Sequence, residues 1–200
     1  MNAGELRDKI EIMELYEAVE GVWDWRVKNT VYAKAEHQTS RSIFSRNGIS
    51  AQSIKFTIRE YPELTLHNAV NFATDNGKHC FVSDINRDMR SHYVLTAALV
   101  EPVRCVIERV KIVKGELNRP KKEQLPTLEF PGMLTEKYTR QEQREPMSYS
   151  EVRYVLVTPK VITIEVGQLV RIGGEAYEIV IPHTLDLYKN EYEILRKADN

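Results

Sequence analysis

Apolar and polar residues alternate in short runs along this chain, the pattern of β-strands that bury one face. In the first half these runs lie at 9–12, 31–35, 55–58, 80–82 and 93–99. Turn signals such as Asn76-Gly77 and Tyr61-Pro62 stand between them. No long run has the 3.6-residue period of an amphipathic helix. The pattern therefore predicts an all-β chain that folds as a small antiparallel barrel or sandwich.

The same pattern occurs twice. Residues 55–66 read KFTIREYPELTL and residues 153–164 read RYVLVTPKVITI, with only Thr65 and Thr163 identical. Further apolar positions and turns correspond at offsets of 97 to 100 residues. They are Val70 with Val170, Phe72 with Ile172, Asn76-Gly77 with Gly173-Gly174, Cys80 with Tyr177, Val82 with Ile179, and Leu95 with Ile194. At the start of each half, Leu6, Ile10 and Ile12 correspond to Val106, Val110 and Ile112.

This repetition predicts two tandem β domains related by internal duplication, residues 1–105 and residues 106–200. Each half also contains one polar connection that does not have a strand pattern. The first is 37–53, HQTSRSIFSRNGISAQS, and the second is 139–151, TRQEQREPMSYSE. A connection longer than about a dozen residues in a small barrel is usually functional or disordered, and a short helix within the first one is left open.

The composition is that of an ordinary folded chain, because 42% of the 200 residues are hydrophobic and 28% are charged. The formal net charge is −1, but residues 104–122 hold seven basic and two acidic residues, a local +5. We favour a solvated strand and linker over a binding patch for this segment. The stretch 118–126, NRPKKEQLP, has two prolines and is a poor strand sequence. No apolar run approaches the roughly 20 residues of a membrane span, which predicts no membrane partner.

The sequence contains no recognisable catalytic or metal-binding motif. His79-Cys80 suggests a thiol and a base, but the matching positions in the second half are Ala176-Tyr177. A position that takes Cys or Tyr is typical of a packed interior, so we predict a buried, inert thiol. The five histidines, at 37, 67, 79, 92 and 183, lack metal-ligand spacing. The prediction is a protein that is not an enzyme, without catalytic residues, cofactor or metal.

Several stretches of the first half resemble the head-tail joining or stopper proteins of long-tailed phages. They are GELRDKIEI at 4–12, a tryptophan at 23 or 25, VYAKAE at 31–36, KFTIREYPELT at 55–65 and CFV at 80–82. The resemblance covers residues 4–105. It implies a small β-barrel that forms a homo-oligomeric ring beneath the portal and adaptor proteins and closes the DNA channel after packaging.

The resemblance also implies where the channel is contacted. The long connection between the second and third main strands of these proteins projects into the channel, which places residues 37–53 there. Arg41 and Arg46 would then face double-stranded DNA or neighbouring subunits, and Ile43 and Phe44 would pack as a plug. Family members commonly have one domain, and the second half has only EFPGMLTEKYT, at 129–139, as a loose match to VYAKAE. The barrel of the second half would contact the first tail ring or a neighbouring subunit.

These expectations describe a structural protein of the virion neck, assembled in the cytoplasm of the host bacterium. Its partners would be its own copies, the portal and adaptor proteins, tail-completion or tail-tube proteins, and packaged DNA. Two alternatives remain open at this point. One is a tail-completion or tail-terminator protein that stays with the tail. The other is a β-barrel adaptor that binds peptides along an exposed sheet edge.

Overall fold

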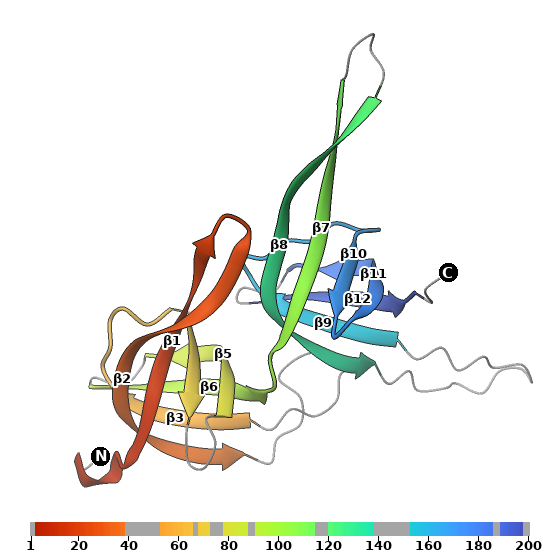
Figure 1. Ribbon diagram of the computed structural model, residues 1–200. Coiled ribbons are helices and arrows are strands. Elements are labelled where there is room, and N and C mark those ends of the chain that lie inside the picture. Colours follow the sequence, from red (N-terminus) through yellow and green to blue (C-terminus); the bar gives the residue numbers. More distant parts are fainter. Residues whose placement is uncertain are drawn as a thin grey trace, which may run out of the picture.

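The computed structural model of the protein describes residues 3–38, 53–65, 68–72, 78–87, 91–114, 120–137, 153–185 and 189–197. A single 3-10 turn at Ala3–Glu5 precedes twelve strands (Figure 1). The strands are β1 (Asp8–Val19), β2 (Val22–Gln38), β3 (Ser53–Arg59), β4 (Asn68–Phe72), β5 (Lys78–Asn86), β6 (His92–Val100), β7 (Val103–Lys114), β8 (Pro120–Lys137), β9 (Arg153–Pro159), β10 (Leu169–Ile172), β11 (Glu175–His183) and β12 (Lys189–Arg196). The predicted all-β class is confirmed.

The first six strands form a closed antiparallel barrel, here called the N-terminal barrel. Their order is β1-β4-β5-β6-β3-β2, and the pairing of β1 with β2 completes the circle. The predicted antiparallel barrel is therefore present. Closure satisfies the backbone hydrogen bonds that the edge strands of an open sheet would leave unpaired.

The last six strands pair in the order β7-β10-β11-β12-β9-β8, and the pairing of β7 with β8 completes this circle, here called the C-terminal barrel. All of its pairings are antiparallel. Gly173 and Gly174 form the two-residue turn between β10 and β11, with φ of 59° and 89°. Both glycines thus have the positive φ that the predicted tight hairpin turn requires.

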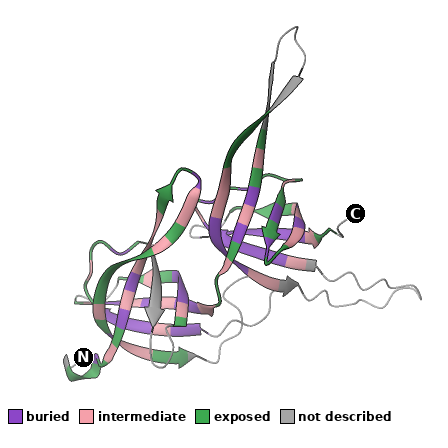
Figure 2. Cartoon of the chain, in the orientation of Figure 1, coloured by how far each residue is buried: buried purple, intermediate pink, exposed green. Residues whose placement is uncertain are grey.

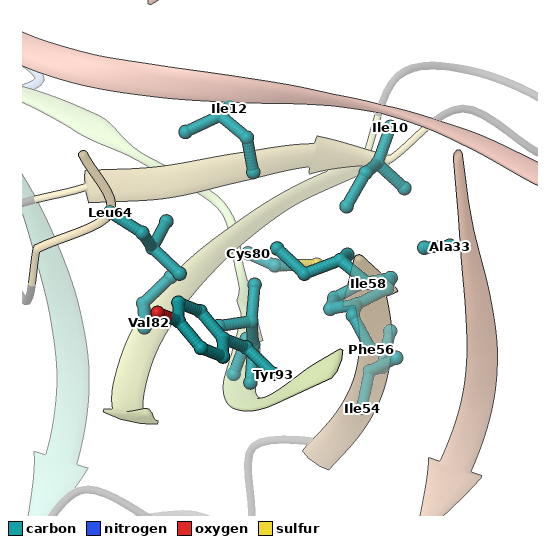
Figure 3. Close-up of a cluster of buried hydrophobic side chains, with 12 residues drawn as sticks. Ile10, Ile12, Ala33, Ile54, Phe56, Ile58, Leu64, Cys80, Val82 and Tyr93 are labelled. Carbon is teal, nitrogen blue, oxygen red and sulfur yellow. The ribbon is translucent and has the colours of Figure 1, made fainter. Parts of the chain in front are cut away.

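Each barrel has its own buried core, built from the inward-facing residues of its strands. In the N-terminal barrel, Ile10, Ile12, Phe56, Ile58 and Val82 are completely buried (Figure 3). The corresponding cluster of the C-terminal barrel consists of Cys105, Ile107, Phe130, Leu156, Ile162, Ile164, Val170, Ile172, Tyr177, Ile179, Tyr192 and Ile194. Burial of each large apolar side chain contributes roughly 1.5–3 kcal/mol, so these two clusters dominate the stability of the fold.

Two pairs of strands are much longer than the sequence pattern predicts. β1 and β2 have 12 and 17 residues, and β7 and β8 have 12 and 18. The extra residues leave the barrels as two-stranded hairpins (Figure 1). Much of the described surface of these hairpins is exposed, including Val19, which is 63% exposed (Figure 2). Strand residues that do not face the core of their own barrel have no reason to follow its alternation of apolar and polar residues, so the pattern did not reveal these extensions.

The interpretation of 118–126 as a poor strand is wrong for its described residues, because β8 begins at Pro120. Pro120 is the first residue of the strand, where proline is tolerated. Pro126 lies in a bulge, where the register moves from Ile107–Leu128 to Arg109–Leu125. A bulge releases residues from the ladder, so the missing N–H of proline costs no hydrogen bond there. Similarly, His37, Gln38 and Ser53 belong to strands and not to the first polar connection.

The matching of the two first strands is also wrong. Ile10 pairs with Phe72, and the residue that pairs with Ile172 in the same place is Cys105. Cys105 and Ile107 therefore occupy the positions of Ile10 and Ile12, whereas Val110 is 52% exposed. By their places in the two strand orders, the first strands align at an offset of 95 residues. The offset of 100 is misleading because β-branched residues continue from β7 into the projecting hairpin and mimic a core pattern.

Candidate functional site

The connection expected to enter the channel joins β2 to β3. Arg41, Ile43, Phe44 and Arg46 lie outside the described residues, but both ends of the connection are described. Gln38 pairs with Ser53 as the last pair of the β2–β3 ladder, and Ser53 is buried. Residues 39–52 therefore leave and re-enter the barrel at adjacent positions. The predicted location between the second and third strands is confirmed, and the contacts of the four residues stay a prediction.

Charged side chains lie on the strands just before this connection. Lys34 donates to Glu36 at 2.6 Å, and Glu36 is paired across the ladder with Lys55. The hydrogen bond with Glu36 raises the pKa of Lys34, and the same bond lowers the pKa of Glu36. Both side chains are exposed, so salt screens this pair and it adds little to stability. It places charges of both signs beside the base of the connection.

The C-terminal barrel has a connection at the same place in its strand order. Lys137 pairs with Arg153 at the end of the β8–β9 ladder, and residues 138–152 join the two strands. The predicted polar connection 139–151 falls within this range and lies outside the described residues. Each barrel thus has one long connection after its second strand, anchored by a closing pair of residues.

The two barrels meet where the tip of the β1–β2 hairpin rests on β8. Val22 pairs in parallel with Glu129, whose N–H donates to the carbonyl oxygen of Gly21 at 2.7 Å. Gly21 has a φ of 80°, and a Cβ there would lie 2.6 Å from the carbonyl oxygen of Thr127. Glycine is therefore required twice, by the backbone conformation and by the close approach of the two chain segments.

Arg104 of β7 ties the two barrels together with its guanidinium. It donates to the Glu129 carboxylate at 2.8 Å and to the carbonyl oxygen of Trp23 at 3.2 Å. The Asp24 carboxylate lies 3.8 Å away. One side chain of the C-terminal barrel thus contacts both β8 and the first hairpin. Hydrogen bonds between charged groups are the stronger kind, and here they fix the orientation of the hairpin.

An apolar cluster fills the space between the barrels. Its buried members come from both, and they are Phe81, Ala98, Met133, Val155 and Val157. Trp25 packs against this cluster and makes an edge contact with Phe81 at 6.3 Å between ring centroids. Trp23, two residues earlier on β2, packs against the core of the C-terminal barrel. Alternate residues of a strand share a face, so both tryptophans lie on one face of the hairpin, Trp23 against the C-terminal core and Trp25 against the cluster between the barrels.

This junction is packed and does not form a ligand pocket. The hollow among Trp25, His79, Phe81 and Met133 has a volume of about 10 Å³, about the space of one water molecule. The ring of His79 lies 5.5 Å from that of Trp25, and burial lowers the pKa of His79 to about 4. His79 is therefore neutral at neutral pH and acts as a packing residue of the junction.

The two cysteines have no reactive environment. Both are completely buried, Cys80 in the N-terminal core and Cys105 in the C-terminal core. Burial raises the pKa of each thiol to about 12, so the nucleophilic thiolate is scarce at neutral pH. The predicted burial of Cys80 is confirmed. The described residues contain no group of three His, Cys, Asp or Glu side chains placed to hold a metal ion.

A larger hollow, of about 290 Å³, opens on the outside of the N-terminal barrel beside β2. It is lined by Leu6, Val31, Tyr32, Arg59, Glu60 and Tyr61. Tyr32 is 62% exposed at its rim. Apolar rings and one pair of opposite charges suit a protein contact better than a small polar substrate.

Sequence reasoning missed the junction. It used Trp23 or Trp25 only as part of a resemblance, and it counted Arg104 only as one charge of a basic segment. The available signal was the Glu20-Gly21 turn, which stands between the acidic segment 11–20 and a segment that contains both tryptophans. That signal identifies a hairpin, but not the strand on which its tip rests, because the partner Glu129 is more than 100 residues away.

Comparison of the chain with family models, with curated proteins and with solved structures finds no match. Within the described ranges, no helix is both long and apolar enough to span a membrane.

Proposed function

We propose that the protein is a ring-forming component of a phage neck that closes the DNA channel beneath the portal. The observation that carries this proposal is the closed barrel whose long connection leaves β2 and returns to β3 through the Gln38–Ser53 pair. The sequence resemblance supports it, because its motif residues have structural places in this barrel. Ile10 and Ile12 of the GELRDKIEI stretch are core residues, and Ala33 of VYAKAE is also buried.

The proposal includes a tandem duplication of one barrel, with residues 1–105 and 106–200 as its two domains. It is supported by the equal strand order of the two circles of strands. Matched residues also pair with matched residues, since Phe56 pairs with Leu95 and Tyr154 with Ile194. The ladders β5–β6 and β11–β12 both have a register shift, after Val82 and after Ile179. A shared bulge position is a feature that unrelated barrels have no reason to share.

In this proposal a ring of copies brings several 39–52 connections to one axis. A single connection offers only Arg41 and Arg46 to DNA phosphates, which gives weak, salt-sensitive attraction. Many copies raise the effective concentration of these contacts, and Ile43 and Phe44 from neighbours add an apolar plug. The face of the ring toward the capsid binds portal or adaptor proteins, and the opposite face binds tail-completion or tail-tube proteins.

Replacement of residues 39–52 by a short Gly-Ser linker tests this function. The barrel is expected to remain folded, because the linker still joins the adjacent residues Gln38 and Ser53. Filled heads carrying this variant are expected to lose packaged DNA or to fail to join tails. The double variant Arg41→Ala with Arg46→Ala is expected to leak less, because steric closure does not depend on those charges alone. DNA retention can be measured by nuclease protection of purified heads.

Normal DNA retention and infectivity with the linker variant would exclude closure by this connection. If the variant heads instead retain DNA but carry tails of abnormal length, the tail-completion alternative is favoured. A far-ultraviolet circular dichroism spectrum equal to that of the wild type serves as the folding control for both variants.

A further inference from the structure

The β1–β2 hairpin makes the contact between the two barrels of one chain, and the β7–β8 hairpin is a second element of the same kind. The β1–β2 hairpin extends past the N-terminal barrel and rests on β8 at Glu129. The β7–β8 hairpin is the corresponding element of the C-terminal barrel and extends equally far. Val19, the end of β1, lies seven residues beyond the core residue Ile12, and Lys114 lies seven beyond Ile107.

The β7–β8 hairpin has no strand beside it in the described part of the chain. Beyond Val106, β7 pairs only with β8, and before Glu129, β8 pairs only with β7. In Figure 1 the hairpin points away from both barrels. Val110 and Leu125 are 52% and 38% exposed on it. A two-stranded hairpin with exposed apolar residues is marginally stable alone, and its open edges favour pairing with another strand.

The N-terminal barrel offers a place that corresponds to Glu129. Glu129 pairs with Val106, the residue after Cys105 on β7. Thr30 pairs with Glu11, the residue after Ile10 on β1. Because Cys105 and Ile10 hold the same place in the two barrels, Thr30 is the counterpart of Glu129. Thr30 is exposed, and so are Val27 and Tyr32 on either side of it. From Trp23 to Tyr32, the described pairings of β2 are with β1 only. The hollow beside Tyr32 adjoins this place.

The formal charges of the two elements are also complementary. Residues 104–122 carry seven basic and two acidic residues. Residues 5–24, which include β1, carry seven acidic and two basic residues. β1 is the strand that lies beside β2 at Thr30. Glu14 of β1 already pairs with Arg26 and Lys28 of β2. The other acidic residues of this segment are the ones that favour the approach of a basic hairpin in this orientation.

We propose that the β7–β8 hairpin of one copy docks on β2 of the next copy near Thr30, as the β1–β2 hairpin docks on β8 within each copy. The contact joins different surfaces of the two copies, so its repetition about a rotation that closes gives a ring in which N-terminal and C-terminal barrels alternate. This inference rests on the duplication and ring assembly proposed above, and it identifies the surfaces that would form the ring. Duplex DNA is a different partner for a basic hairpin, but the exposed Val110 and Leu125 favour protein.

Cross-linking between two singly substituted full-length chains tests the contact. Within one chain, Val22 pairs with Glu129. Thr30 is the counterpart of Glu129 at an offset of 99 residues, and the same offset makes Lys121 the counterpart of Val22. The first variant is therefore Lys121→Cys and the second is Thr30→Cys. With a short bifunctional maleimide, the mixture is expected to give a covalent dimer. The control mixture combines Lys121→Cys with Asp84→Cys, an exposed position on β5 of the same barrel, and is expected to give none. The buried native thiols do not interfere.

The outcomes separate this inference from the proposed function. Light scattering is expected to show that the wild type is an oligomer. The double variant Val27→Asp with Tyr32→Asp is expected to stay folded but to be a monomer. An oligomer without the specific cross-link would overturn the docking and leave ring assembly standing. A monomer without a cross-link would overturn both. A third outcome is that the chain binds duplex DNA, that Lys121→Glu abolishes this binding, and that the chain stays oligomeric without the specific cross-link. This outcome would make the hairpin a DNA-binding element and overturn the docking.

Discussion

At the scale of single residues, Gly21 shows how the junction constrains the sequence. Alanine there would combine a φ of 80° with a Cβ 2.6 Å from a backbone oxygen of Thr127. Gly167 is a matched control, because its φ is 82° and no atom lies within 4 Å of its Cβ position. We expect Gly167→Ala to lower the free energy of unfolding by roughly 1–2 kcal/mol, the cost of the conformation alone. Gly21→Ala is expected to cost more, as measured by urea denaturation, and equal costs would contradict the close contact.

His79 makes a second residue-scale prediction, which concerns pH. Its pKa is about 4 in the folded protein, below the ordinary 6.5, because it is buried. As the pH falls below 6.5, the unfolded chain binds a proton before the folded chain does, so this group costs stability progressively until about pH 4. The loss is on the order of 3 kcal/mol. His79→Gln is expected to flatten the decline of unfolding free energy across this window. Parallel wild-type and variant curves would show that His79 is not buried in the neutral form.

At the scale of elements, the sequence predicts strands where one face is buried and fails where none is. Phe56 and Ile58 alternate with polar neighbours because they point into a core, and β3 was predicted from them. Val19 and Val110 lie on projecting hairpins, where no core imposes a period. For the same reason the first strands were matched five residues out of register. The place of the 39–52 connection was predictable from its composition, whereas the hairpin–barrel contact depends on long-range packing that no local pattern encodes.

At the scale of the whole molecule, the junction decides whether the two barrels act as one body. Each barrel has a separate core, so their mutual stabilisation depends on the shared cluster around Phe81 and Met133 and on the Arg104 contacts. Trp25 covers this cluster from the β1–β2 hairpin. Because an interface of this kind is small compared with a core, the loss of one large side chain should uncouple the barrels.

We therefore expect Trp25→Ala to separate the unfolding of the two barrels. The truncation removes an aromatic contact with Phe81 and leaves a cavity in the shared cluster, at a cost of about 2–4 kcal/mol. Differential scanning calorimetry is expected to show one transition for the wild type and two for the variant. Tyr16→Ala is the control, because Tyr16 pairs with Asp24 on the opposite face of the same hairpin and contacts Arg26 there. Its profile should keep a single transition. Two transitions already present in the wild type would mean that the junction positions the barrels without coupling their stability, and the docking of each hairpin would then be an orienting contact.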